Sequence, residues 1–181
     1  MIMIKSQITN HKSQNHGFSL VETLVAVGIL AVAVIGALSA ASSGISSSIF
    51  SKDQVIAFYL AQEAVEEIRN IRDENALNGQ PWLTGITGNS ADPCYFGNKC
   101  YVDTLDAAPL VRCSGNCPVM KQDSVTGFYG YDLTWEDTLF TRTVELTSIN
   151  SHEISILVTV DWSKGVIDRQ FRVRENILDW Q

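Results

Sequence analysis

An apolar stretch near the N-terminus places the strictest limit on how this chain folds. Eighteen residues, from Leu24 to Ala41, contain no charged side chain. At about 1.5 Å of rise per residue, a helix over residues 18–41 would be roughly 36 Å long. This length exceeds the hydrocarbon core of a bilayer, which is roughly 30 Å thick. The sequence therefore predicts one membrane-spanning helix at 18–41 with a soluble part after it.

The segment before this helix, residues 1–17, is polar and carries two lysines, two histidines and no acid. A basic flank of this kind stays on the cytoplasmic side of a membrane, so we interpret it as a cleaved leader. Glu22 interrupts the apolar helix, and an acid in a bilayer costs about 2.5 to 3.5 kcal/mol without a partner. Cleavage between Gly17 and Phe18 would place the new α-ammonium group one helical turn from Glu22, or against Glu22 of a neighbouring subunit.

The run Gly17-Phe18-Ser19-Leu20-Val21-Glu22, followed by an apolar helix, resembles the processing site of type IV prepilins and type II secretion pseudopilins. The resemblance implies that a prepilin peptidase cuts after Gly17, that Phe18 becomes the N-methylated N-terminus, and that Glu22 guides assembly into a filament. Thr23 departs mildly from the family, which often has an apolar residue there. Many major pilins have a helix-kinking proline, which is missing here between Phe18 and Gln80, so minor pilins and pseudopilins are the closer resemblance.

The resemblance also implies partners and a location. The partners are other pilin or pseudopilin subunits, the prepilin peptidase, the inner-membrane assembly platform and the lipid bilayer. The chain would be a single-pass protein of the bacterial inner (cytoplasmic) membrane with an extracytoplasmic C-terminal domain, and later part of a pilus or pseudopilus filament. The net charge of -7 and the scattered basic residues give no stripe that could neutralise phosphates, so no nucleic acid is required.

Two other interpretations of the N-terminal segment are open. A cleaved secretory signal peptide would explain the basic flank and the apolar run, with small residues at 37–41 for the cut. It would be about 40 residues long, against the usual 15 to 30 or so. A plain single-pass anchor would need no cleavage. Both leave Glu22 without a partner, so we favour the prepilin interpretation.

Apolar residues recur at helical spacing beyond the membrane segment, at Ile45, Ile49, Ile56, Leu60, Ala64, Ile68 and Ile71. This stripe predicts an amphipathic stem helix at 42–74 that continues the helix at 18–41 and packs on a domain. Asn78-Gly79 and Pro81 are expected to end it. Small residues between 28 and 48 either pack closely against neighbouring helices or, as the pilin resemblance suggests, let the stem melt locally during assembly.

Residues 75–130 show no sustained period, which predicts a long connection with little regular structure. It holds all four cysteines, Cys94, Cys100, Cys113 and Cys117. In an extracytoplasmic domain an even number of cysteines indicates disulfides, and four allow three connectivities. We favour Cys94 with Cys100 and Cys113 with Cys117, because each pair brackets a short turn containing a glycine. A four-thiolate zinc site is the rival, although the usual C-x2-C spacing is missing, and we expect no metal.

From Phe140 onward the pattern changes to a period of two. Residues 154–162 alternate apolar and polar side chains, and so do residues 166–177. Ser163-Lys164-Gly165 between them is typical of a turn. Together these segments predict a β-hairpin. Residues 140–149 add a strand, and 129–135 a candidate fourth. An antiparallel sheet at 131–181 needs a cover for its apolar face, and the stem helix is available. We therefore predict an α+β, pilin-like fold in which sheet and stem helix form one globular domain.

The sequence contains no nucleophile elbow, phosphate-binding glycine loop or zinc-protease motif, and His152 is the only histidine after the leader. We therefore expect no enzyme, no catalytic residue and no cofactor. Two function classes remain. The first is a structural subunit, a minor pilin or pseudopilin, of a type IV pilus or a type II secretion-like filament. The alternative is a membrane-anchored extracytoplasmic binding or adhesion module.

Overall fold

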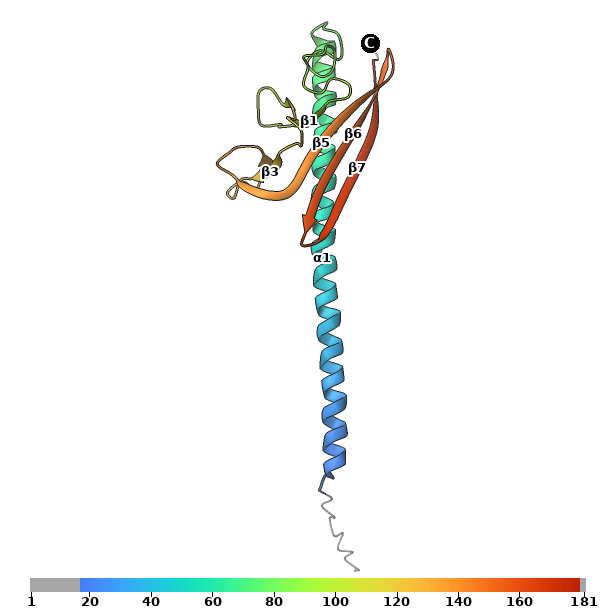
Figure 1. Ribbon diagram of the computed structural model, residues 1–181, viewed down its shortest axis with the longest axis vertical. Coiled ribbons are helices and arrows are strands. Elements are labelled where there is room, and N and C mark those ends of the chain that lie inside the picture. Colours follow the sequence, from blue (N-terminus) through green and yellow to red (C-terminus); the bar gives the residue numbers. More distant parts are fainter. Residues whose placement is uncertain (1–16, 180–181) are drawn as a thin grey trace, which may run out of the picture. The chain divides into compact units, whose positions relative to one another are not determined.

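The computed structural model describes residues 17–179, and the leader expected at 1–17 lies outside this range except for Gly17. The chain divides into two compact units, one ending at Ser48 and one beginning at Ile49. Helix α1, Leu20–Leu77, contributes residues to both units (Figure 1). By length and composition, α1 can cross a membrane. The predicted helix over 18–74 is thus present, with its ends shifted by two or three residues.

Helix α1 ends at Leu77, next to the Asn78-Gly79 pair that was predicted to end it. The Asn78 amide donates to the Glu74 carbonyl at 3.0 Å, and Gly79 has a φ of 67°, a conformation that favours glycine. The Asn75 side-chain amide then donates to the carbonyls of Trp82 and Thr84. These bonds turn the chain away from the helix and fix the segment that follows.

One sheet of seven strands follows α1 in the second unit, and all of its strand pairs are antiparallel. The strands are β1 Lys99–Val102, β2 Leu110–Arg112, β3 Val119–Gln122, β4 Tyr129–Gly130, β5 Glu136–Asn150, β6 Glu153–Lys164 and β7 Ile167–Leu178. The order is β2-β1-β5-β3-β4, and β6 pairs with both β5 and β7. The long helix and the antiparallel sheet confirm the predicted α+β fold.

The three long strands form the part of the sheet that the alternating pattern predicted. Along β6 the side chains of Ile154, Ile156, Val158, Val160 and Trp162 are buried, and they share one core with the α1 residues Leu60, Ala64 and Ile68. β7 runs beside α1, with Phe171 packed on Phe58 and the Arg72 guanidinium donating to the Leu178 carbonyl at 3.1 Å. The second half of α1 therefore covers the apolar face of the sheet.

The segment 75–130, predicted as a connection with little regular structure, is mostly turn and loop and contains the four short strands β1 to β4. Each of these strands has four residues or fewer, too short to show a period. β1 and β3 both pair with β5, so their strand conformation depends on residues distant in sequence. Only Tyr129 and Gly130 of the candidate strand 129–135 are in a strand. The strand ends at Gly130, and two residues later the Asp132 carboxylate accepts hydrogen bonds from the Thr134 amide and hydroxyl.

Candidate functional site

The peptide bond between Gly17 and Phe18 lies just before the first turn of α1. Residues 17–19 are not helical, and the Phe18 side chain is 80% exposed. Apart from its two chain neighbours, no described residue has an atom within 4 Å of the position that a Cβ on residue 17 would take. The described structure therefore accepts a larger residue at position 17, and the glycine needs an explanation outside the fold.

Ser19 is the N-cap of α1. Its hydroxyl oxygen accepts a hydrogen bond from the Glu22 amide at 3.2 Å, and its carbonyl accepts the first intrahelical bond from the Thr23 amide at 3.1 Å. A serine followed three residues later by a glutamate is the sequence pattern of a capping box, and the structure shows the hydrogen bond to the serine hydroxyl. We did not predict this cap, although the pattern Ser-x-x-Glu is visible in the sequence.

Glu22 accordingly lies in the first turn of α1. A carboxylate at this position interacts favourably with the positive end of the helix dipole and with the unpaired amides of the first turn. Ser19 and the helix terminus position the acid, while its side chain has no cationic partner among the residues that the structure describes.

The side chains of the first half of α1 are not buried by the rest of the described chain. Every residue from Gly17 to Lys52 is exposed. The exposed apolar side chains lie on all sides of the helix, and Gly28, Gly36 and Gly44 have open space around them. A helix that is apolar all round needs an apolar environment, which a bilayer or neighbouring helices supply.

The four cysteines form two disulfides, Cys94–Cys100 and Cys113–Cys117. This is the pairing that we favoured, and it leaves none of the four thiols free to bind zinc. The first bond joins the segment after α1 to β1, and both of its cysteines are fully buried. The second closes the turn between β2 and β3. Within residues 17–179, no group of three acidic, histidine or cysteine side chains could hold a metal ion.

A buried arginine connects the sheet to α1. Arg142 on β5 is 1% exposed, and its guanidinium donates to the Leu60 carbonyl at 2.8 Å and to the Glu63 carboxylate at 2.7 Å. It also donates to the Val102 carbonyl at the end of β1. The other oxygen of Glu63 accepts from the Thr104 hydroxyl at 2.6 Å. One ion pair thus holds the loop after β1 against the helix.

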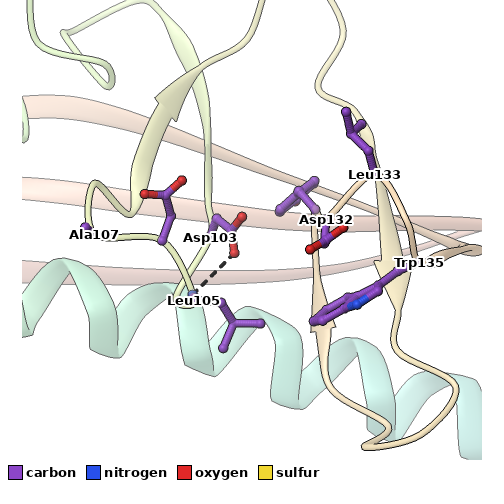
Figure 2. A pocket seen from close by; sticks show the side chains of 8 residues that line it. Asp103, Leu105, Ala107, Asp132, Leu133 and Trp135 are labelled. Carbon is purple, nitrogen blue, oxygen red and sulfur yellow. Dashed lines mark hydrogen bonds between the residues drawn. The ribbon is translucent and has the colours of Figure 1, made fainter.

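Two connections of the sheet form an open pocket of about 530 Å³. Asp103, Leu105, Asp106 and Ala107 come from the β1–β2 connection, and Tyr131, Asp132, Leu133 and Trp135 from the β4–β5 connection. Figure 2 shows Asp103 and Leu105 on one side and Asp132 and Trp135 on the other. Burial raises the pKa of Tyr131 to about 12, opposed by the positive charge of Arg142.

Comparison with known proteins locates the motif at the N-terminus. Residues 12–38 match the family model described as the prokaryotic N-terminal methylation motif. No curated protein and no solved structure matches the chain. The match covers the Gly17, Phe18 and Glu22 positions and the first part of α1. Together with the long apolar helix and the antiparallel sheet, it supports a type IV pilin-like or pseudopilin-like protein.

Proposed function

We propose that this pilin-like chain is a structural subunit that a prepilin peptidase cuts after Gly17 and that assembles through α1 into a filament. The methylation motif at 12–38 is the observation that carries the proposal. It is supported by the exposed, non-helical backbone at residues 17–19, since a protease needs an accessible and extended chain. Phe18 would then be the N-methylated first residue of the mature subunit.

The choice of glycine at position 17 supports recognition by a peptidase. A positive φ or a close neighbour is the usual structural reason for a glycine. Beyond its two chain neighbours, no described residue lies close to a Cβ placed at Gly17. A requirement for a small residue at the cleavage site would explain why glycine stands there.

Glu22 would bind a positive charge that the isolated chain lacks. Cleavage creates an α-ammonium group on Phe18, one turn from Glu22 in the same subunit and available to Glu22 of a neighbour. In a bilayer or a filament core such a pair gains strength because little water competes for either charge. Formation of this pair would favour docking of each subunit in one register, while the apolar surface of α1 supplies the affinity.

The mature subunit would reside in the bacterial inner membrane with its sheet on the extracytoplasmic side, where the disulfides are stable. We assign it to minor pilins or pseudopilins, because α1 runs from Leu20 to Leu77 without a proline. Its partners would be other subunits, the peptidase and the assembly platform. The role is structural rather than enzymatic.

Substitutions of Glu22 test this proposal. Glu22→Gln removes the charge and keeps a residue suited to the capping box, whereas Glu22→Ala removes both. We expect both variants to be processed and present in the membrane but missing from sheared filaments. Filament incorporation is measured by immunoblotting against the membrane fraction. Normal incorporation of Glu22→Gln would show that the residue serves only as a cap and would contradict the charge-pair mechanism.

The open pocket favours a second candidate, a membrane-anchored binding module that uses α1 only as an anchor. In that case Glu22→Ala would leave both surface display and ligand binding unchanged, with no filament present in the parent strain. Loss of filament incorporation with intact display in the membrane supports the structural subunit instead.

A further inference from the structure

The pocket between the β1–β2 and β4–β5 connections is built around a glycine. A Cβ on Gly130 would lie 3.0 Å from the Trp135 ring and 3.2 Å from a methyl group of Leu105. The Trp135 ring and Leu105 thus approach the strand backbone more closely than a side chain at position 130 would allow. The result is an aromatic and aliphatic surface next to carboxylates on both sides of the pocket (Figure 2).

Contacts with the rest of the second unit hold both walls in place. Thr104, next to Asp103, donates to Glu63 on α1, and Arg142 binds the carbonyl of Val102 on the other side. Tyr131 in the opposite wall packs against Tyr101 of β1, with ring centroids 4.3 Å apart. Both chain segments that line the pocket, the β1–β2 and the β4–β5 connection, are therefore held against the rest of the second unit.

Three carboxylates line the pocket, from Asp103, Asp106 and Asp132. Each accepts a hydrogen bond from a backbone amide of its own loop, at 3.3, 3.1 and 2.8 Å. Within residues 17–179 none of the three forms an ion pair. The hydrogen bonds from Thr134 lower the pKa of Asp132, which favours its charged form. Lys121, which pairs with Asp137 and donates to the Trp135 carbonyl at 3.4 Å, is a nearby positive charge that also acts on Asp132. The three carboxylates outnumber this one ammonium group, so the pocket carries net negative charge.

The side chains that line the pocket indicate which kind of cation, a metal ion or an organic cation, it could bind. A metal ion needs several oxygen ligands within about 2.6 Å. These carboxylates are too dispersed, because no group of three acids among the described residues could hold a metal. An organic cation on an apolar stem suits the lining better. Its stem can contact Leu105 and Leu133, and its charge can lie over the Trp135 ring or near a carboxylate.

We propose that the pocket formed by Asp103, Leu105, Asp132 and Trp135 binds a lysine or arginine side chain presented by a partner protein. The exposed rim supports a protein partner, because Leu133 at 89% exposed and Leu105 at 57% exposed offer apolar contact around the charged group. This surface lies in the sheet unit and does not depend on cleavage at Gly17 or on assembly through Glu22.

Binding of a labelled tetralysine peptide to the full chain in nonionic detergent tests the proposal. The key variant is the double substitution Asp103→Asn and Asp132→Asn, because asparagine keeps the side-chain oxygen that accepts the loop amides. A matched control neutralises Asp161 and Asp168 on the β6–β7 hairpin, where Asp161 accepts a hydrogen bond from Gln170. Fluorescence anisotropy measures the affinity, and hydrogen exchange checks that each variant keeps its fold.

We expect the pocket variant to bind tetralysine about tenfold more weakly and the control to bind within about twofold of the parent. Trp135→Leu changes no charge and should weaken binding about threefold through loss of the cation–π contact. A tetrapeptide of acetyl-lysine should not bind. Equal losses in the pocket variant and the control would reveal diffuse attraction to an acidic protein and overturn the proposal. Calcium binding that the pocket variant alone loses would also overturn it, by making the pocket a metal site.

Discussion

The two halves of α1 share one helical backbone but bury their side chains differently. In residues 20–48 every side chain is exposed, and apolar residues lie on all sides. In residues 49–77 the buried side chains form a stripe, at Ala57, Leu60, Ala61, Ala64, Val65, Ile68 and Arg72. The distribution of apolar residues around a helix therefore indicates where its partners lie. The first half needs partners outside the chain, whereas the second finds them in the sheet.

Matched isoleucine truncations test this difference most strongly. Ile68 is fully buried in the second half, whereas Ile29 in the first half is 67% exposed. We expect Ile68→Ala to lower the free energy of unfolding of the sheet unit by about 2 to 5 kcal/mol, through lost burial and a residual cavity. Ile29→Ala should leave it unchanged. Denaturant titration in detergent, followed by near-UV circular dichroism, measures both. Similar losses of unfolding free energy in the two variants would contradict the conclusion that only the second half of α1 packs on the sheet.

Arg142 tests how the second half of α1 is fixed to the sheet. Arg142→Ala leaves the carbonyls of Leu60 and Val102 and the Glu63 carboxylate without their partner, and we expect a loss of about 3 kcal/mol. Arg142→Met, which fills similar space without charge, should recover part of the loss. The same denaturant titration measures both variants. A loss in Arg142→Met equal to that in Arg142→Ala would indicate that the hydrogen bonds, and not the filled volume, determine stability.

Removing a disulfide is expected to give the next largest loss of stability, and both disulfides lie in the second unit. Replacing both cysteines of a pair by alanine should cost about 2 kcal/mol through loss of the short closed loop. We expect a greater cost for Cys94 and Cys100, because both side chains are fully buried, than for Cys113 and Cys117 at the turn. Thermal unfolding of the two double variants gives the order. The reverse order would mean that the turn between β2 and β3 contributes more than the buried link.

The last expected effect is confined to alkaline pH. Burial raises the pKa of Tyr131 to about 12 from an ordinary value of 10.0. The folded state thus keeps a proton that the unfolded state releases, so stability falls as pH rises from about 10 to 12. Below pH 10 this contribution is complete and constant. Tyr131→Phe should remove this part of the pH dependence, and an unchanged alkaline profile in that variant would assign the loss to other groups.

Periodicity predicted the parts of the fold in which one face repeats over many residues. The stem helix and the β6–β7 hairpin are of this kind, and so is β5, whose alternation places Arg142 on the inner face between Thr141 and Thr143. The sequence did not identify the partners of Arg142, because they lie on α1 and at the end of β1. The four short strands were missed for a similar reason, since their conformation depends on pairing with β5 or with one another.

The candidate sites also differ in whether the sequence alone could identify them. Gly17, Phe18 and Glu22 are contiguous and could be identified as a motif, and the Ser19 cap could have been found from the same run. The pocket could not be predicted, because Asp103 and Asp132 are far apart in sequence and face one pocket only through the pairing of β1 and β3 with β5. Local motifs are visible in sequence, whereas sites formed by distant strands need the structure.

The mature N-terminus tests most directly whether the first half of α1 is an assembly element. The protein is purified from bacterial membranes that contain a prepilin peptidase, and its N-terminal peptide is analysed by mass spectrometry. We predict a chain that begins at Phe18 and carries a methyl group on the α-amino nitrogen. A chain that begins near Ala41, or one that retains residues 1–17, would contradict the account.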